Sequence, residues 1–207
     1  MSLVKYNNNS ISAVTSTGLA TGSLVPIKTL TASSSATLSF VHGTDGVVLD
    51  STYPIYRFEF INIHPANNGT TFQFNMSTDN GSNYNVTKTT TSFRPFHYES
   101  DPTDFAYETY EDLAQGTGFQ TICQNLGNAN DENSGGSLTL FNPSSTTFVK
   151  HFISTTNMSH NATYPASVCW FIAGYGNTVS AVNAIRFQML SGNIDSGKIK
   201  LYGIKDS

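Results

Sequence analysis

Histidines and carboxylates are the side chains of this sequence best suited to chemistry, but their spacing does not indicate a catalytic site. No two histidines stand at the close spacings that zinc-binding motifs use. The five histidines are His42, His64, His97, His151 and His160. The sequence also has no Gly-x-Ser-x-Gly nucleophile motif and no phosphate-binding glycine loop. We therefore predict a protein that is not an enzyme, with no catalytic residue, no cofactor and no metal ion.

Most carboxylates gather in one segment, residues 92–135, where aromatic residues lie between them. The acidic residues are Glu99, Asp101, Asp104, Glu108, Glu111, Asp112, Asp131 and Glu132. No Lys or Arg occurs between Arg94 and Lys150. Three interpretations remain open: a solvated segment pinned by its aromatic residues, a contact surface for another subunit, or a site for a glycan or a cation. A glycosidase would need two carboxylates roughly 5 to 10 Å apart, and sequence spacing cannot establish that distance.

Tyrosines can stack on sugar rings, and carboxylates can bind sugar hydroxyls or Ca²⁺. No Asp-x-Asp-x-Asp-Gly calcium motif is present, so the sequence gives little support for a calcium-binding site. The candidate residues for contact with a partner or a glycan are Tyr98, Tyr107, Tyr110, Glu108, Glu111 and Asp112.

Composition limits the class of protein to which the chain can belong. The 207 residues are 38% hydrophobic and 12% aromatic, enough for a sizeable core, whereas only 12% are charged. The formal net charge of −4 argues against general binding to nucleic acid, which needs a basic surface. The sequence has no apolar run of about 20 residues, so it predicts no transmembrane helix, and no secretory signal is visible. We expect Cys123 and Cys169 to be free thiols.

The spacing of apolar residues predicts an all-β protein. Alternation with a period of two, interrupted by turn residues, is typical of short strands with one buried face. The predicted strands are Leu24–Leu30, Ala36–Val41, Ile55–Ile63, Thr70–Ser77, Asn85–Thr91, Ser137–Phe141, Thr147–Ser154, Ser167–Ala173, Val182–Leu190 and Lys198–Gly203. Such a series favours an antiparallel β-sandwich, with a jelly roll as its natural form at this length.

Local signals refine this organisation. Asp79-Asn80-Gly81 predicts a tight turn, with Asn85–Thr91 as the returning strand of a hairpin. The phase of alternation changes at Ile61 and Ile63, which predicts a β-bulge or a change of sheet. Thr147–Ser154 has apolar residues on both faces and is interpreted as a buried strand.

We divide the chain into an N-terminal arm, residues 1–22, and one sandwich domain, residues 23–207. Residues 92–135 form a long irregular acidic and aromatic excursion within that domain. The best helical candidate, Thr103–Ala114, has only a weak pattern.

Four stretches of the sequence resemble a group of small virion proteins from tailed phages, especially marine phages. They are Ser51–Asn85, Tyr98–Thr117, Leu140–Ser154 and Ser196–Lys205, within a similarity that covers about residues 35–204. Its clearest marks are a strand followed by an Asn-Ile-His-Pro turn at Asn62–Pro65, and Ser-Gly-x-Ile-x-Leu-Tyr-Gly at Ser196–Gly203. These motifs are structural and bring no catalytic residues.

The resemblance implies a β-sandwich structural protein of a virion, assembled in the host cytoplasm. It implies a homo-oligomer, with a trimer favoured, and other virion proteins as partners, such as a major capsid protein or fibre and tail components. We expect no nucleic acid and no membrane as partners. Capsid decoration is the function that we predict, and a receptor-binding or carbohydrate-binding module of a fibre or tail tip is the alternative.

Overall fold

The structure is a computed structural model that describes residues 23–161 and 163–206. The predicted arm, residues 1–22, lies outside the described residues. The described chain folds into strands joined by turns and loops, and it contains no helix that could cross a membrane. The strands are β1 (Leu24–Thr31), β2 (Leu38–Val41), β3 (Ile55–Pro65), β4 (Thr70–Ser77), β5 (Lys88–Tyr98), β6 (Thr103–Tyr107), β7 (Gln120–Leu126), β8 (Ser134–Phe141), β9 (Lys150–Ser159), β10 (Ala166–Gly176), β11 (Ala184–Met189) and β12 (Ile194–Ile204).

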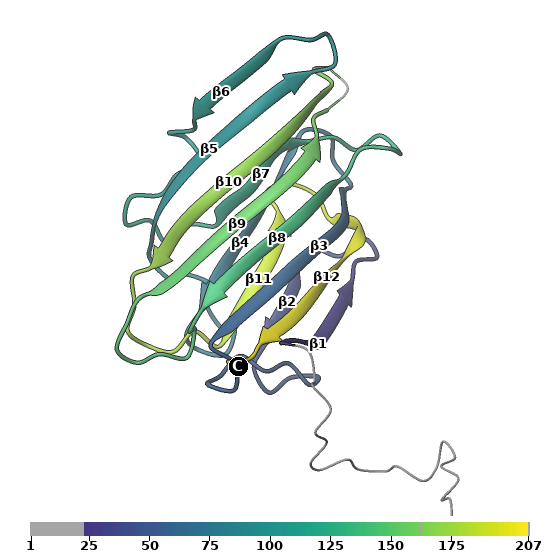
Figure 1. The fold of residues 1–207 in the computed structure, drawn as a ribbon. Coiled ribbons are helices and arrows are strands. Elements are labelled where there is room, and N and C mark those ends of the chain that lie inside the picture. Colours follow the sequence, from purple (N-terminus) through teal and green to yellow (C-terminus); the bar gives the residue numbers. More distant parts are fainter. Residues whose placement is uncertain (1–22, 162, 207) are drawn as a thin grey trace, which may run out of the picture.

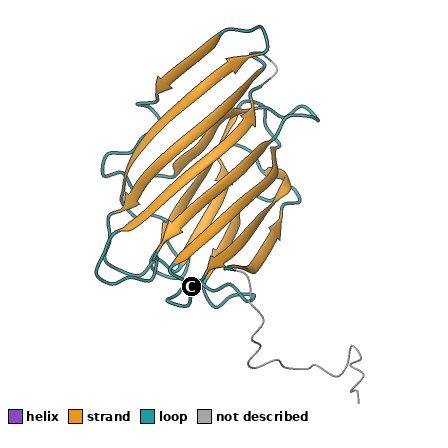
Figure 2. Cartoon of the chain, viewed as in Figure 1, coloured by secondary structure: helices purple, strands orange, loops and turns teal. Residues whose placement is uncertain are grey.

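The strands form two antiparallel sheets that pack face to face, as predicted for a β-sandwich. The large sheet has eight strands in the order β1-β12-β3-β8-β9-β10-β5-β6, and the small sheet has four in the order β2-β11-β4-β7. In Figure 1 the large sheet faces the viewer and the small sheet lies behind it. Figure 2 shows the same two layers as strands and loops alone.

The strand pairing is that of a jelly roll, in which a long hairpin is rolled so that its paired arms enter both sheets. The nested antiparallel pairs are β2 with β11, β3 with β8, β4 with β7, and β5 with β6. The meander β8-β9-β10 fills the place between β3 and β5. Strands β12 and β1 widen the large sheet beyond β3, so the sheet is broader than an eight-stranded jelly roll needs.

The core between the sheets is centred on Phe187 of β11. Its ring lies between 5.4 and 6.3 Å from the rings of five other phenylalanines. These are Phe40, Phe58, Phe60, Phe72 and Phe74, and all are buried. Aromatic pairs at this separation add to the free energy gained by burying apolar area. The alternation predicted for β11 and β12 is observed, since Ile185, Phe187, Ile199 and Leu201 all face the core.

A polar contact also joins the two sheets. The ammonium group of Lys88 in β5 donates hydrogen bonds to Asn75 Oδ1 in β4 at 2.6 Å and to the Val86 carbonyl at 2.7 Å. The Asn75 amide in turn donates to the carbonyls of Tyr84 and Thr117, at 2.6 and 3.0 Å. Because Lys88 is 0% exposed, burial lowers its pKa to about 7. Asn75 and Lys88 thereby hold two loops against one end of the small sheet.

The predicted hairpin is wrong, although its turn is correct. Asn80 and Gly81 both have positive φ, 57° and 80°, as the tight-turn signal requires. However, β4 pairs with β11 and β7, whereas β5 pairs with β10 and β6 in the other sheet. The chain therefore crosses the sandwich after the turn, and the contact between Asn75 and Lys88 fastens that crossing.

The prediction that strands disappear over residues 92–135 is also wrong. The end of β5, all of β6 and β7, and the start of β8 lie there, and Thr103–Ala114 contains β6 in place of a helix. Strand β6 escaped prediction because both of its faces are open, so burial does not make its residues alternate. Strand β7 escaped prediction because it begins with two polar residues, Gln120 and Thr121, which are buried and hydrogen-bonded to Glu111.

The bulge predicted near Ile61 is confirmed, and it explains the two motifs behind the resemblance. The pairing of β3 with β8 shifts between Phe60 and Ile63, and Asn62 has φ of 51°. Asn62–Pro65 is the bulged end of β3 and not a turn. On the neighbouring strand, a Cβ on Gly197 would lie 2.4 Å from the Asn62 carbonyl oxygen, and φ there is +115°. Glycine at 197 thus lets β12 pass the bulge.

Candidate functional site

The predicted tyrosines separate into two kinds in the structure. Tyr98 is half-buried at the end of β5, where its ring lies 4.3 Å from that of Phe96. Tyr107 at the end of β6 is exposed, and Tyr110 in the following loop is 94% exposed. The two exposed tyrosines are free to contact a partner, whereas Tyr98 contributes mainly to packing.

The predicted carboxylates are used within the chain. Glu108 Oε1 lies 2.6 Å from Arg94 Nε, and the Arg94 guanidinium lies over the rings of Phe96 and Trp170. Glu111 accepts a hydrogen bond from the Thr121 hydroxyl, and burial raises the pKa of its carboxyl. These contacts fix the loop after β6 against the inner side of the large sheet.

Asp112 accepts a hydrogen bond of 2.7 Å from the Tyr107 hydroxyl, a bond that raises the pKa of this tyrosine. Asp112 and Tyr107 are both on the surface, so this pair could be rearranged by a ligand. Among the six predicted residues, Tyr107, Tyr110 and Asp112 are therefore the ones that the fold leaves accessible.

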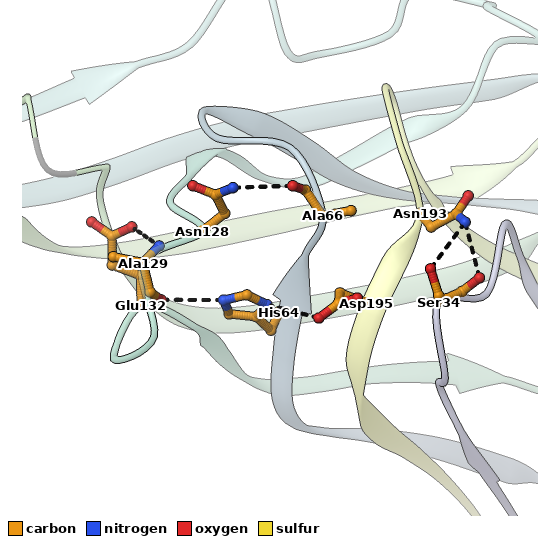
Figure 3. Close-up of polar contacts among 8 residues, drawn as sticks. All are labelled: Ser34, His64, Ala66, Asn128, Ala129, Glu132, Asn193 and Asp195. Carbon is orange, nitrogen blue, oxygen red and sulfur yellow. Dashed lines mark hydrogen bonds and ion pairs between the residues drawn. The ribbon is translucent and has the colours of Figure 1, made fainter.

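The histidine that comes closest to a catalytic geometry is His64 on β3. Its Nδ1 lies 3.8 Å from Asp195 Oδ2, and its Nε2 lies 3.2 Å from the Ala129 carbonyl oxygen (Figure 3). A polar depression of about 350 Å³ adjoins it, lined in part by Asn62, Glu132 and Ser196. No hydroxyl or thiol of the described residues hydrogen-bonds to this imidazole, so it lacks a nucleophile to activate.

The contacts around His64 fasten loops to one another. Asn128 donates to the Ala66 carbonyl at 3.0 Å, and Asn193 donates to the Ser34 carbonyl at 2.9 Å (Figure 3). Glu132 accepts a hydrogen bond of 2.7 Å from the Ala129 amide. No group of three or more His, Cys, Asp or Glu residues in the described chain could hold a metal ion. These contacts join the bulged end of β3 to the loops around it.

The outer face of the large sheet has an uneven distribution of charge. Strand register places Tyr107, Phe93, Phe171, Thr155, Ser137, Glu59 and Lys200 in one row across seven strands. A second row contains Thr91, Ala173, Ile153, Thr139, Arg57 and Tyr202. In both rows charge begins only at β3. The outward positions of β6, β5, β10, β9 and β8 carry no Asp, Glu, Lys or Arg.

We call this part of the outer face the uncharged face. Its members are Thr103, Phe105, Tyr107, Thr89, Thr91, Phe93, Pro95, His97, Ser167, Cys169, Phe171, Ala173, Tyr175, His151, Ile153, Thr155, Asn157, Gly135, Ser137, Thr139 and Phe141. No described loop crosses it in Figure 1. Strands β3 and β12 continue the same face with Arg57, Glu59, Lys198 and Lys200.

Aromatic rings give the uncharged face its apolar character. The Phe93 ring stacks on Phe171 at 5.0 Å and contacts Phe105 at 5.6 Å. Phe105 is 68% exposed and Ile153 is 52% exposed. Two shallow depressions lie in this face, one of about 540 Å³ beside Phe105 and Cys169 with Asp104 at its β6 margin, the other of about 450 Å³ beside Ile153 and Tyr175 without a charged residue in its lining. Exposed aromatic residues without neighbouring charge are typical of the centre of a protein interface.

The sequence pattern did not predict this surface, because apolar residues on both faces of Thr147–Ser154 indicated a buried strand. The observed β9 alternates strictly, with Phe152 buried and Ile153 outward. The sequence signal for this exposed face was the presence of apolar residues on both faces of β9 and β10. Such a strand is either covered on both sides or leaves one apolar side open.

Comparison of the chain with protein families, curated proteins and solved structures finds no match to any of them.

Proposed function

We propose that this chain is a structural subunit of a bacteriophage virion, acting through surface contacts and not through catalysis. Capsid decoration is the role that we favour, with the major capsid protein as its partner. The observation that carries the proposal is the uncharged face, a broad surface of exposed aromatic residues among uncharged polar ones on a firmly packed jelly roll. Its rings are held by strand pairing and by one another, so contact requires little ordering of side chains. The resemblance to small phage virion proteins is the reason for proposing a phage virion as the assembly.

The test is binding to isolated phage capsids that lack the chain. We expect saturable binding and a higher melting temperature of the capsid, because a subunit that binds only the intact shell stabilises it. The variant Phe105→Ser should weaken binding at least about tenfold, as removal of an exposed interface aromatic often does. Phe148→Ser is the matched control, since Phe148 is 69% exposed but lies outside the uncharged face. Absence of capsid binding under assembly conditions would refute decoration.

The second candidate is a receptor-binding or carbohydrate-binding module of a phage fibre or tail tip. Tyr110 and Tyr107 favour it, because an exposed tyrosine ring can stack on a sugar and Tyr107 lies beside an accessible carboxylate. A glycan array and inhibition of phage adsorption by the purified chain test it. Tyr110→Ala should abolish glycan binding while leaving the melting temperature unchanged. An image of the intact particle that locates this chain would decide between head and tail.

A further inference from the structure

The uncharged face is large enough to form a stable contact with another molecule. It spans five strands, which at about 4.8 Å between neighbours gives a width of about 24 Å. Strands β9 and β10 have 10 and 11 residues, while β6 has 5. At about 3.3 Å per residue, the mean strand length is about 30 Å, so the face covers about 700 Å². Two such faces in contact would bury about 1,400 Å², which is the size of a standard specific interface.

The absence of charge restricts which partner can cover this face. A charged group pressed against it would be buried without a counter-charge, at a large cost in free energy. The partner surface must therefore be as poor in charge as the uncharged face itself. A second copy of this chain supplies such a surface, because its outward strand positions carry no Asp, Glu, Lys or Arg and the carboxylates of Asp104 and Asp112 lie only at its β6 margin.

Strand β6 also favours a partner on this face. It pairs only with β5, and its side chains stay accessible on both sides, so within one copy it is stabilised by little besides its hydrogen bonds. The opposite edge strand, β1, carries Pro26, which lacks an amide donor, and Lys28. Proline and lysine are residues that protect a sheet edge from pairing. Strand β6 has neither, but its five-residue length and Asp104 also limit edge pairing, so its bearing on the proposal is that it holds Phe105 and Tyr107 exposed on the uncharged face.

We propose that two copies of this chain pack through their uncharged faces, with the outer sides of β8, β9, β10, β5 and β6 in contact about a two-fold axis. Ile153 and Phe171 lie near the middle of that interface, and Arg57 and Lys200 lie outside it. The inference rests on the proposed assembly function, because it names the partner of the same surface. Because both contacts use the uncharged face, the second copy and the capsid compete for it.

The test is the mass of the full chain in solution, measured by light scattering during size-exclusion chromatography over a range of concentrations. We expect a dimer for the wild type. Ile153→Lys should raise the dissociation constant about a hundredfold, because it buries an unpaired charge in the interface. Ile61→Lys is the matched control: Ile61 is also an outward isoleucine of this sheet, 36% exposed, but it lies on the charged side on β3. It should leave the dimer intact.

Circular dichroism checks that each variant is folded, and Thr155→Lys, at an already exposed position, replaces Ile153→Lys if that variant fails to fold. A monomeric or trimeric wild type overturns the inference. A dimer that dissociates in the Ile61→Lys variant also overturns it, and so does a dimer that persists in both Ile153→Lys and Thr155→Lys. A monomer that still binds capsids would end this inference and leave the proposed function standing, whereas a dimer without capsid binding would do the reverse.

Discussion

The two faces of the large sheet carry the same aromatic residue in very different surroundings. On the inner face, Phe58, Phe60, Phe96 and Phe152 are all buried. On the outer face, Phe93, Phe105, Phe141 and Phe171 occupy strands of the same sheet and remain partly or largely exposed. The rings of Phe58, Phe60 and Phe152 contact phenylalanines of the opposite sheet. On the outer face, the Phe93 ring contacts those of Phe105 and Phe171. Composition alone therefore cannot separate a core aromatic residue from an interface aromatic residue in this chain.

This difference indicates what holds the fold and what is left for contact. The inner rings contribute to the free energy of folding, since each loses its exposed area when the sheets pack. The outer rings have already lost part of that area to their neighbours, and the rest remains to be buried. A comparison of matched substitutions on the two faces can establish whether folding and assembly depend on separate sets of residues.

The largest effect is expected from Phe187→Ala, at the centre of the core. Removal of a buried phenylalanine ring leaves a cavity and typically costs about 3 to 5 kcal/mol of unfolding free energy. Urea denaturation at low protein concentration measures the loss. Phe171→Ala, on the outer face, should cost only about 1 kcal/mol, the value of its stacking on Phe93. Equal losses in monomeric protein would show that the outer face also belongs to the core.

The inner face also holds a buried lysine, whose effect should depend on pH. The pKa of Lys88 is lowered to about 7 by burial, from 10.5. Between these values the unfolded chain keeps the proton and the folded chain does not, so unfolding free energy should rise with pH. The slope reaches about 1.4 kcal/mol per pH unit for one proton, and the contribution is constant below pH 7. Denaturation from pH 6 to 10 measures this rise.

Lys88→Met should lose this rise, which then appears as a pH-dependent difference in unfolding free energy between wild type and variant. The matched control is Lys200→Met on the outer face of β12, which should keep the rise. Other titrating groups, including the buried Lys150, act equally in all three proteins and cancel in the difference. If Lys88→Met and Lys200→Met gave the same pH profile as the wild type, Lys88 would be charged inside the fold or accessible to water.

The sequence predicted the sandwich and ten of its strands because inward residues alternate wherever the two sheets cover each other. It placed the boundaries of β4 correctly, since every second residue from Phe72 to Met76 faces the core. It also predicted a bulge or a change of sheet at Ile61 and Ile63, where the phase of the pattern changes, and the structure has a bulge there with a positive φ at Asn62. What it could not provide was which strands pair, since hairpin and crossover use the same turn residues.

The candidate site was harder to predict for a physical reason. Acidic residues with aromatic neighbours indicated a surface, but Glu108 and Glu111 are held by Arg94 and Thr121, on strands β5 and β7 that the sequence did not predict at these positions. The uncharged face depends on five strands whose order in the sheet, β8-β9-β10-β5-β6, is not their order in the sequence. Its lack of charge becomes visible only when the rows across those strands are assembled.

The smallest perturbation is a chemical probe of the two cysteines, which lie on different faces. Burial raises the pKa of both thiols, that of Cys123 in the core to about 12, but Cys169 lies only half-buried in the uncharged face and is open to a reagent. A thiol reagent should therefore label Cys169 in the native protein and Cys123 only after unfolding, because the thiolate is the reactive form and must be reached by the reagent. Mass spectrometry of digested protein locates the label.

The same probe reports whether the outer face is covered. If two copies meet through the uncharged face, labelling of Cys169 should slow as protein concentration rises, while the Ile153→Lys variant should stay fast at every concentration. Cys169→Ser should take up no label in native protein, which assigns the signal. A rate that does not change with concentration in a dimeric wild type would place the interface elsewhere on the molecule, since Cys169 lies beside Phe171 at its proposed centre.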